Sequence, residues 1–316
     1  SLGDILYRDL TDAVFYAPGK WSMKMCPNPV CGLLWLDPMP VAEDLPAAYE
    51  GYYTHGVETR PALYAGGRFL YRFVMDVALW LTGIPAERRR SELMFIEDVP
   101  RGRLLDVGCG YGTFLAAMKR RGWQVAGVDF DPVAAEAARR TYGLDVRVGT
   151  IENVKAGGPA YDVITASHVI EHVPDPVSFL STCRALLKPG GLLVLKTPNA
   201  DSFGSRRYGP AWRGLEPPRH LHIFTLDALQ ACARRAGFSV SRCFTSAAAA
   251  DGILLASRFI ERNKSFREAE LSVGQKVQSR LLRPTLALLA KLKWLRNRNS
   301  GEEICAILLN DAEADR

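Results

Sequence analysis

A glycine-rich segment follows a short apolar run near the middle of the chain and reads LLDVGCGYGT over residues 104–113. Glycines let the backbone approach a ligand closely, and the helix expected after them presents unpaired N–H groups at its start. The spacing is G-x-G-x-G, which differs from the G-x-G-x-x-G of dinucleotide sites. The alternative interpretation is a tight turn of an α/β fold that holds no ligand.

Asp106 lies just before this turn, and its charge bears on which ligand the loop would accept. A carboxylate there repels a pyrophosphate and attracts an ammonium group, directly or through water. S-adenosylmethionine carries an amino-acid end and no phosphate, so the loop favours this molecule over NAD. The cofactor-binding residues expected from the loop are Asp106, Gly108, Cys109, Gly110 and Gly112.

Residues after the next two expected strands complete the predicted cofactor site. Asp129 ends an apolar run, where an acid accepts hydrogen bonds from both ribose hydroxyls in nucleotide-binding α/β folds. Phe130 follows and is placed to pack on the adenine face. The backbone of Ile151 and the side chain of Glu152 are placed to bind the adenine edge, and the alternative for Glu152 is a helix-capping acid.

A first histidine cluster reads SHVIEH over residues 167–172. His168, Glu171 and His172 are three and four residues apart, so a helical turn would place them on one face. Such a group could bind a divalent metal ion that orients an acceptor. In the alternative, which we expect, there is no metal, Glu171 and His172 hold the loop by hydrogen bonds, and Ser167 and His168 contact the cofactor. All three cluster residues are also candidate catalytic groups.

A second cluster reads WRGLEPPRHLHIF over residues 212–224. Prolines stiffen such a loop. Arg219 is placed to hold an anionic group of the acceptor. His220 is the candidate general base, because histidine exchanges protons near neutral pH. The alternative is a structural loop whose histidines bond to backbone carbonyls.

Four motifs between residues 103 and 245 occur in a fixed order: LLDVGCGYGTFL, GVDFDP, YDVITASHVIEHVPDP and LLKPGGLLVLKTPN. This set resembles the class I S-adenosylmethionine-dependent methyltransferase superfamily, in particular the branch with the ubiquinone-biosynthesis O-methyltransferases and many uncharacterised bacterial enzymes. The resemblance implies a seven-stranded sheet with one antiparallel strand and a cofactor over the carboxyl ends of its first strands. In the resembled quinone enzymes a glutamate stands where this chain has His168.

Short apolar runs alternate with amphipathic stretches from residue 103 onward, which predicts a Rossmann-like α/β fold with helices on both faces of the sheet. The expected strands are 103–107, 124–129, 144–148, 161–167, 192–197, 238–244 and 304–309, and the expected helices are 113–121, 131–141, 177–187 and 226–236. Around a methyltransferase core at 101–250 we expect an irregular Cys- and Pro-rich extension at 1–60, a helical cap or linker at 61–100, a basic helical insert at 251–300, and the last strand and tail at 301–316.

The cysteines of the N-terminal extension resemble part of a metal site. Cys26 and Cys31, with Gly32 after them, look like half of a zinc ribbon, but a structural zinc site needs four ligands. His55 is a remote third candidate, so we expect no complete site. The seven cysteines are scattered and odd in number, which indicates reduced thiols. With no secretory signal and no membrane-spanning apolar run in this sequence, we expect a cytoplasmic setting.

The positive charge of the chain is concentrated in the expected insert. Eleven basic and three acidic side chains lie between residues 258 and 300, against a net charge of +6 for the whole chain. The rest is near neutral, so we expect no nucleic-acid partner. Within residues 281–295, leucines and Trp294 alternate with basic residues. This pattern fits peripheral contact with an anionic membrane through residues 275–300, whereas the alternative that we favour is a helix that covers the active site or makes a dimer contact.

These observations together predict methyl transfer from S-adenosylmethionine to an oxygen of a small-molecule or glycan acceptor, with a histidine as general base. The first alternative is a quinone or isoprenoid-precursor methyltransferase that works at the membrane surface. The second alternative is a non-catalytic module that binds S-adenosylmethionine within a biosynthetic complex.

Overall fold

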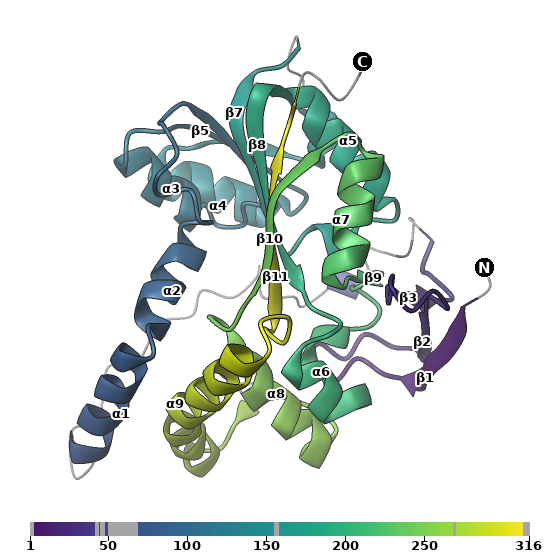
Figure 1. Ribbon diagram of the computed structural model, residues 1–316, viewed down its shortest axis with the longest axis vertical. Helices are drawn as coiled ribbons and strands as arrows, with labels where there is room; N and C mark the ends of the chain where they lie inside the picture. Colours follow the sequence, from purple (N-terminus) through teal and green to yellow (C-terminus); the bar gives the residue numbers. More distant parts are fainter. Residues whose placement is uncertain are drawn as a thin grey trace.

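The computed structural model describes residues 3–41, 44, 48–49, 69–154, 158–267 and 270–311. Its centre is a seven-stranded sheet in the order β10-β11-β8-β7-β4-β5-β6 (Figure 1). Neighbours from β8 to β6 are parallel, whereas β11 is antiparallel to both β8 and β10. The expected sheet with one antiparallel strand is therefore confirmed. The strands are β4 (Arg103–Val107), β5 (Gln124–Asp129), β6 (Asp145–Val148), β7 (Tyr161–Ser167), β8 (Leu187–Pro198), β10 (Ser239–Ser246) and β11 (Glu303–Leu309).

Helices cover both faces of this sheet, as the apolar patterns predict. Leu105 and Leu104 are neighbours in β4 whose side chains point to opposite faces. Leu105 belongs to a core cluster with α5 (Pro176–Leu186) and α7 (Leu226–Arg235). Leu104 belongs to a second cluster with α3 (Thr113–Arg120) and α4 (Pro132–Tyr142). The parallel strands are thus buried on both sides, which is the usual environment of parallel sheets.

Local capping signals define several helix ends. Asp131 is the N-cap of α4, where its side chain accepts a hydrogen bond from the Val133 amide, and Pro132 is the first helical residue. Gly237, with φ of 83°, follows α7 as expected. One boundary differs from the expectation: residues 188–191 belong to the start of β8, because β8 pairs with β7 from Leu187 onward.

The N-terminal segment, expected to be irregular, forms strands instead. β1 (Asp4–Leu10), β2 (Trp21–Met25) and β3 (Leu34–Asp37) are antiparallel neighbours, and β3 also pairs with β9 (His222–Ile223). Met23 and Leu36 are buried against the loop that contains Trp212. The strands are stabilised by this packing against a distant loop, which local sequence does not reveal. Cys26 and Cys31 are free thiols in the turn between β2 and β3, and His55 lies outside the described residues.

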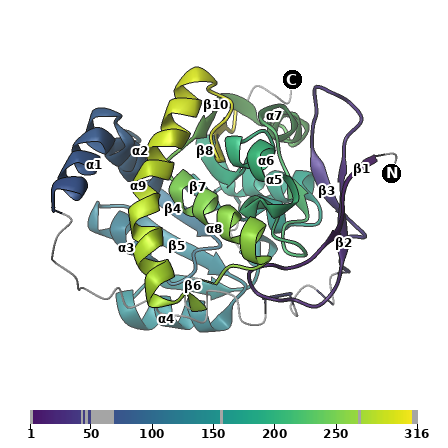
Figure 2. The same cartoon turned by 90° about the horizontal axis from the view of Figure 1, so that it is seen from below.

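The expected helical regions are present on both sides of the core. α1 (Phe69–Leu81) and α2 (Ile84–Glu92) precede β4, and α6 (Phe203–Tyr208) follows β8. The basic insert forms α8 (Ala250–Asn263) and α9 (Val273–Arg296), which pack against each other. Seen from below, α9 runs across the face turned to the viewer (Figure 2). Within the described ranges, no helix combines the length and apolarity needed to cross a bilayer.

Candidate cofactor and acceptor site

The predicted cofactor residues lie near the ends of four neighbouring strands or directly after them. Because β7, β4, β5 and β6 are adjacent and parallel, the segments that follow them meet along one edge of the sheet. These segments are residues 108–112, 130–131, 149–153 and 168–172. In open α/β sheets this carboxyl edge is where ligands bind. The structure therefore brings the sequence-predicted loop residues into one region.

The glycine loop has the backbone geometry that the sequence requires. Gly108, Gly110 and Gly112 have φ of 71°, 51° and 74°, which side chains other than glycine rarely adopt. A Cβ atom on Gly110 would meet nothing within 4 Å, so this residue faces open space. A Cβ atom on Gly112 would instead lie 2.6 Å from Leu144 Cδ1, because Gly112 lets α3 pack closely on its neighbours. The open side at Gly110 is a cradle that a ligand can occupy.

Asp106 is a buried carboxylate near the end of β4. Its side chain accepts a hydrogen bond from Thr165 Oγ1 at 2.6 Å, and the residue is only 6% exposed. Burial raises the pKa of Asp106 to about 7, although the hydrogen bond from Thr165 opposes this. A cation placed beside this group would lower its pKa again, so the site gains free energy when an ammonium group binds. This property fits the amino-acid end of S-adenosylmethionine.

Asp129 and its neighbours form the second part of the cradle. Asp129 Oδ2 accepts a hydrogen bond from Gly110 N at 2.6 Å and Oδ1 from Asp131 N at 2.9 Å. Each carboxylate oxygen has two acceptor sites, so both can still accept from ribose hydroxyls. Asp131 Oδ2 is buried and has no hydrogen-bond partner within the described part of the chain. Phe130 is half exposed and contacts the ring of Tyr49 edge-on, with centroids 4.9 Å apart.

The two predicted adenine-binding residues differ in how far their side chains are buried. The Ile151 side chain is buried in the core, which leaves its backbone at the edge of the sheet, and Glu152 is exposed. The short helix Ile151–Asn153 is capped reciprocally by Thr150 and Asn153. Another pair of residues thus performs the capping that was the alternative role for Glu152. Ser167 ends β7 and is half-buried at the same edge.

His168 lies between two buried carboxylates. Its Nδ1 is 3.0 Å from Glu171 Oε1 and its Nε2 is 2.8 Å from Glu303 Oε1. The His168 side chain is 39% exposed, and its partial burial lowers its pKa, but the hydrogen bonds with both carboxylates raise the pKa to about 10. His168 is therefore an imidazolium at neutral pH, with both N–H groups donating. An imidazolium has no lone pair, so this geometry suits neither a metal ligand nor a proton acceptor.

The compact group of potential metal ligands contains Glu171, His172 and His220, whereas the sequence predicted His168 in place of His220. Residues 170–172 form a 3₁₀ turn, and one potential ligand atom from each of Glu171, His172 and His220 lies within 4.8 Å of the others. The rings of His172 and His220 pack edge-to-face with centroids 4.8 Å apart. Glu171 Oε2 accepts a hydrogen bond from Thr197 Oγ1, and the pKa of Glu171 is lowered to about 2 by His168 against the opposing effect of burial. The structure thus unites the two histidine clusters.

His220 is buried and neutral. Its Nδ1 lies 2.7 Å from the carbonyl oxygen of Gly214, so Nδ1 carries the proton and Nε2 the lone pair. Burial lowers the pKa of His220 to about 4, although the carboxylate of Glu216, 3.7 Å from Nε2, opposes the shift. The arrangement contains both a proton-accepting nitrogen and an anion that can stabilise the charged ring.

Arg219 does not have the role expected from the sequence. The side chain is fully buried, with Nη2 2.9 Å from Asp12 Oδ1 and Nε 2.9 Å from Glu216 Oε1. Its Nη1 also donates to the carbonyl oxygen of Ala48, and its guanidinium stacks over Phe15. These partners occupy the group, so it cannot hold an anionic acceptor. Arg219 instead ties the N-terminal segment to residues 209–221, the loop between α6 and β9.

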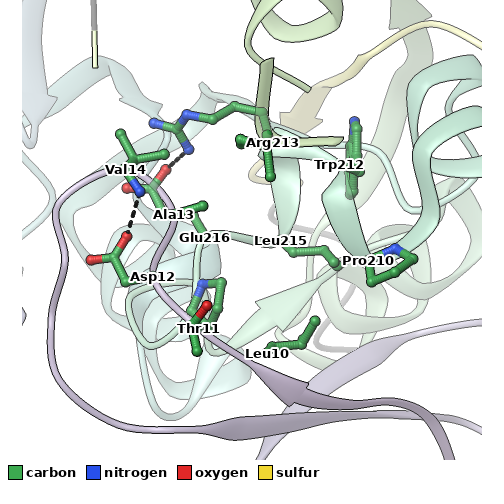
Figure 3. Close-up of a pocket in the computed structure, with 12 residues that line it drawn as sticks. Leu10, Thr11, Asp12, Ala13, Val14, Pro210, Trp212, Arg213, Leu215 and Glu216 are labelled. Atoms are coloured by element: carbon green, nitrogen blue, oxygen red, sulfur yellow. Dashed lines mark hydrogen bonds and ion pairs between the residues drawn. The ribbon is translucent and has the colours of Figure 1, made fainter. Parts of the chain in front are cut away.

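Asp12 and Glu216, two members of this ion-pair cluster, also line a small pocket (Figure 3). Residues 10–14 form one wall, and Trp212, Arg213 and Glu216 belong to the other. Asp12 points toward the amide of Val14, and Arg213 toward Glu216. None of the lining residues comes from the glycine loop. The pocket therefore lies at the junction of the N-terminal segment and the loop of residues 209–221, away from the glycine loop.

Sequence reasoning missed three residues of the site. Glu303 starts β11, 135 residues away from His168 in sequence. Thr197 in β8 supports Glu171. The hydroxyl of Tyr49 lies 3.0 Å from His172 Nδ1 while its ring contacts Phe130. The one available signal was an acidic pair, residues 302–303, directly before an apolar strand. Tyr49 is part of an aromatic-rich segment with no spacing that indicates its contacts.

Comparison with known proteins places half of the chain in a characterised family. A family model described as "Methyltransferase domain" matches residues 85–242, from α2 into β10. This range contains the glycine loop, Asp129 and both histidine clusters. The residues that the structure gathers at the sheet edge thus lie within the matched region, apart from Tyr49 and Glu303.

Curated relatives share substantial identity with part of the chain. A ubiquinone biosynthesis O-methyltransferase of Cereibacter sphaeroides is 40% identical over 146 residues, which cover 43% of this chain and 59% of the relative. An enzyme of the same name from Xanthomonas campestris pv. campestris is 41% identical over 107 residues, which cover 32% and 45%. The chain thus spans about half the length of the curated relatives that it matches.

Solved structures resemble the chain at low identity. A SAM-dependent methyltransferase from Archaeoglobus fulgidus has a TM-score of 0.47 and 20% identity, and the match covers 76% of this chain and 99% of that one. Phosphoethanolamine N-methyltransferase 2 from Haemonchus contortus, solved with S-adenosyl-L-methionine, has a TM-score of 0.47 and 18% identity, with coverage of 69% and 51%.

Proposed function

Because this chain belongs to the family of S-adenosylmethionine-dependent methyltransferases, we propose that it methylates an oxygen of a small-molecule or glycan acceptor, with a histidine as general base. The observation that carries the proposal is the position of Tyr49. Its ring contacts Phe130 on the cofactor side, and its hydroxyl lies 3.0 Å from His172, next to His220. A cofactor cradle and a pair of histidines are thereby adjacent.

The proposed cofactor contacts follow from the donor and acceptor groups at the sheet edge. When bound, S-adenosylmethionine supplies a methyl group that is bonded to a positively charged sulfur, and an acceptor that attacks the methyl carbon in line displaces the sulfur. Asp106 would attract the ammonium group, Asp129 would accept from the ribose hydroxyls, and Phe130 would cover the adenine. The open side of Gly110 leaves room for the amino-acid end. Cys109 contributes a buried side chain that packs beneath the loop.

The low basicity of His220 bears on the acceptor. Moving a proton from a phenol of pKa about 10 to a histidine of pKa about 4 costs roughly 8 kcal/mol. The same transfer from an aliphatic hydroxyl, with a pKa near the value of about 15.7 for water, costs roughly 16 kcal/mol. A turnover of about 10 per second corresponds to a total barrier of roughly 16 kcal/mol. Within the proposed class, a phenolic small molecule is therefore favoured over a glycan.

His168 and Glu171 act in this proposal as positioning residues. Glu171 is held by His168 and Thr197 and faces the two histidines, so its charge stabilises the imidazolium that forms when His220 accepts a proton. The imidazolium of His168 is in turn held by Glu303. His172 lies between Tyr49 and His220 and would orient the acceptor.

A metal-assisted reaction is the second candidate, because Glu171, His172 and His220 place ligand atoms within 4.8 Å of one another. A divalent ion there would lower the pKa of an acceptor hydroxyl directly. The two candidates differ in their response to a chelator. If histidine is the base, turnover persists in EDTA, whereas a metal-dependent enzyme loses turnover in EDTA and regains it with added Mg²⁺ or Zn²⁺.

The test begins with calorimetry of S-adenosylmethionine and its demethylated product, followed by turnover against phenols, catechols and sugars, with and without prenyl chains. His220→Asn should lower kcat by roughly 10²- to 10⁴-fold, as expected for loss of a general base, while cofactor binding is retained. His222→Asn is the matched control, since His222 is a half-buried histidine on β9 outside the cluster. Cofactor binding without turnover on any acceptor would favour the non-catalytic module, and preference for prenylated phenols would favour the quinone-precursor alternative. Turnover by His220→Asn equal to that of the wild type would refute the assignment of His220 as the general base.

A quinone-precursor acceptor would also place the enzyme at a membrane surface. Peripheral contact through residues 275–300 belongs to that alternative. These residues include most of α9, which combines leucines with basic side chains.

A further inference from the structure

Lys196 is a cation near the edge of the sheet where the cofactor residues meet. Asp106 is paired in register with Thr165, and Thr165 is paired with Val194. Lys196 comes two residues after Val194, so its side chain leaves the sheet on the same face as that of Asp106. Lys196 is also paired with Ser167, the last residue of β7, which places it at the carboxyl edge. Lys196 and Asp106 therefore carry opposite charges on one face of the sheet, two strands apart.

The ammonium group of Lys196 can form more hydrogen bonds than the fold gives it. Its Nζ donates to Ser91 Oγ at 3.3 Å, whereas an ammonium group has three N–H donors. Among the described residues Lys196 has no ion-pair partner, although its side chain is half-buried. A half-buried cation of this kind is stabilised by an anion that comes close to it. A ligand with a negative charge at this edge would therefore be attracted to Lys196.

Asp106 and Lys196 influence each other across a space. Burial raises the pKa of Asp106, and the hydrogen bond from Thr165 and the charge of Lys196 oppose this rise. The two groups do not form an ion pair with each other, so a space remains between them. The amino-acid end of S-adenosylmethionine carries an ammonium group and a carboxylate on the same carbon atom. With the ammonium group at Asp106, the carboxylate is complementary to Lys196.

Ser91 offers a second donor for the same carboxylate. Its hydroxyl oxygen accepts from Lys196, so its own O–H can donate to a ligand. The residue is only 5% exposed and lies in α2. The helical insert anchors α2, because Glu87 and Arg88 form ion pairs with α9 and α8 at 2.5 Å and 2.6 Å. The fold thus fixes the position of Ser91 without a ligand.

We propose that Lys196, together with Ser91, binds the carboxylate of S-adenosylmethionine and makes the enzyme select a cofactor with a complete amino-acid end. This inference rests on the proposed place of the ammonium group at Asp106 and does not depend on the acceptor or on the base. In the alternative, water solvates Lys196 and the carboxylate of the cofactor faces solvent.

The experiment is calorimetry at pH 8, where most Asp106 carboxyl groups are ionised. One ligand is the demethylated product of the cofactor, and the other is an analogue of that product in which a hydrogen atom replaces the carboxylate. The wild type should bind the product roughly 10- to 150-fold more tightly than the analogue, which is the contribution of a hydrogen bond to a charged group. Lys196→Met should lose this preference, whereas Lys196→Arg, which keeps the charge, should retain most of it. Ser91→Ala should reduce the preference in part, and it decides the question if Lys196→Met does not fold.

Lys188→Met is the matched control. Lys188 lies near the other end of the same strand, where it pairs with Asp162 at 2.7 Å, so its loss should leave both affinities unchanged. A wild type that binds product and analogue equally, or a preference that Lys196→Met retains in full, would overturn the proposal. Asp106→Asn should weaken both ligands, since both carry the ammonium group. If it weakens neither, the proposed place of the ammonium group is wrong, and this result is distinct from failure at Lys196.

Discussion

Asp106→Asn tests whether the charge of the Asp106 carboxylate contributes to cofactor binding. The substitution replaces a buried carboxylate by an amide of the same shape, which can still accept the hydrogen bond from Thr165. Burial raises the pKa of Asp106 to about 7, so about half of the cofactor-free molecules carry a charge there at neutral pH. An ammonium group binds the charged form. Cofactor binding should therefore release a proton from the molecules in which Asp106 is protonated.

The size of the effect follows from the pKa. About one-tenth of the carboxyl groups are ionised at pH 6 and about nine-tenths at pH 8, so the Kd of the wild type should fall about tenfold between these values. Asp106→Asn should lose this dependence. At pH 8 it should bind roughly 10- to 150-fold more weakly, because a hydrogen bond to a charged group contributes roughly 1.5–3 kcal/mol.

Calorimetry with the demethylated cofactor, at several pH values and in buffers of different ionisation enthalpy, measures both the affinity and the released proton. Asp145→Asn is the control, since Asp145 is exposed at the start of β6 in the same sheet. The folded-state pKa of Asp106 lies above its unfolded value, so its contribution to stability is present below about pH 4 and is lost as the pH rises through 7. Asp106→Asn should thus be more stable than the wild type at pH 8 without cofactor. A Kd of the wild type that is equal at pH 6 and pH 8, or a variant with the same pH slope, would refute the reasoning.

Three further substitutions address other parts of the site. Arg219→Met should lower the free energy of unfolding by about 3–5 kcal/mol, because Asp12 would lose its cationic partner and Glu216 would keep only Arg213. Urea denaturation measures this, and a loss below about 1 kcal/mol would contradict it. His168→Asn keeps a residue that tolerates the left-handed backbone. The stability of this variant should change less with pH than that of the wild type. In the wild type the contribution of His168 is full below about pH 6.5 and is lost as the pH rises through 10. If the melting temperatures of both proteins change equally between pH 7 and pH 10, His168 is not an imidazolium. Gly110→Ala should fold but bind the cofactor more weakly, because the new methyl group enters the open cradle at φ of 51°; unchanged affinity by calorimetry would place the ligand elsewhere.

Local signals were sufficient for most of the core. The strand bounds of β4, β5 and β7 agree with the expected ranges, since each is a short apolar run that ends at an aspartate or serine or is followed by glycine. The N-cap Asp131 and the glycines of the loop act within a few residues of their own position. Such signals are readable because the interactions that they describe are themselves short in sequence.

The N-terminal strands and the acceptor-side chemistry were not readable in this way. Met23 and Leu36 are buried only because a loop some 190 residues later packs on them. His168 was a candidate metal ligand, cofactor contact or catalytic group from its type and spacing alone, and Arg219 a candidate anion ligand. Both expectations assumed that the side chain faces a ligand, whereas each faces buried carboxylates from elsewhere in the chain.

The amino-acid sequence by itself determined the α/β core, the glycine loop and the residue types that gather at its edge. Only the tertiary structure decided the protonation of those residues, because the pKa of a histidine depends on burial and on charges within a few ångströms. The carboxylates of Glu171 and Glu303 make His168 a cation, and burial keeps His220 neutral. Two histidines that the sequence alone does not distinguish therefore differ in charge, because His168 is a cation and His220 is neutral.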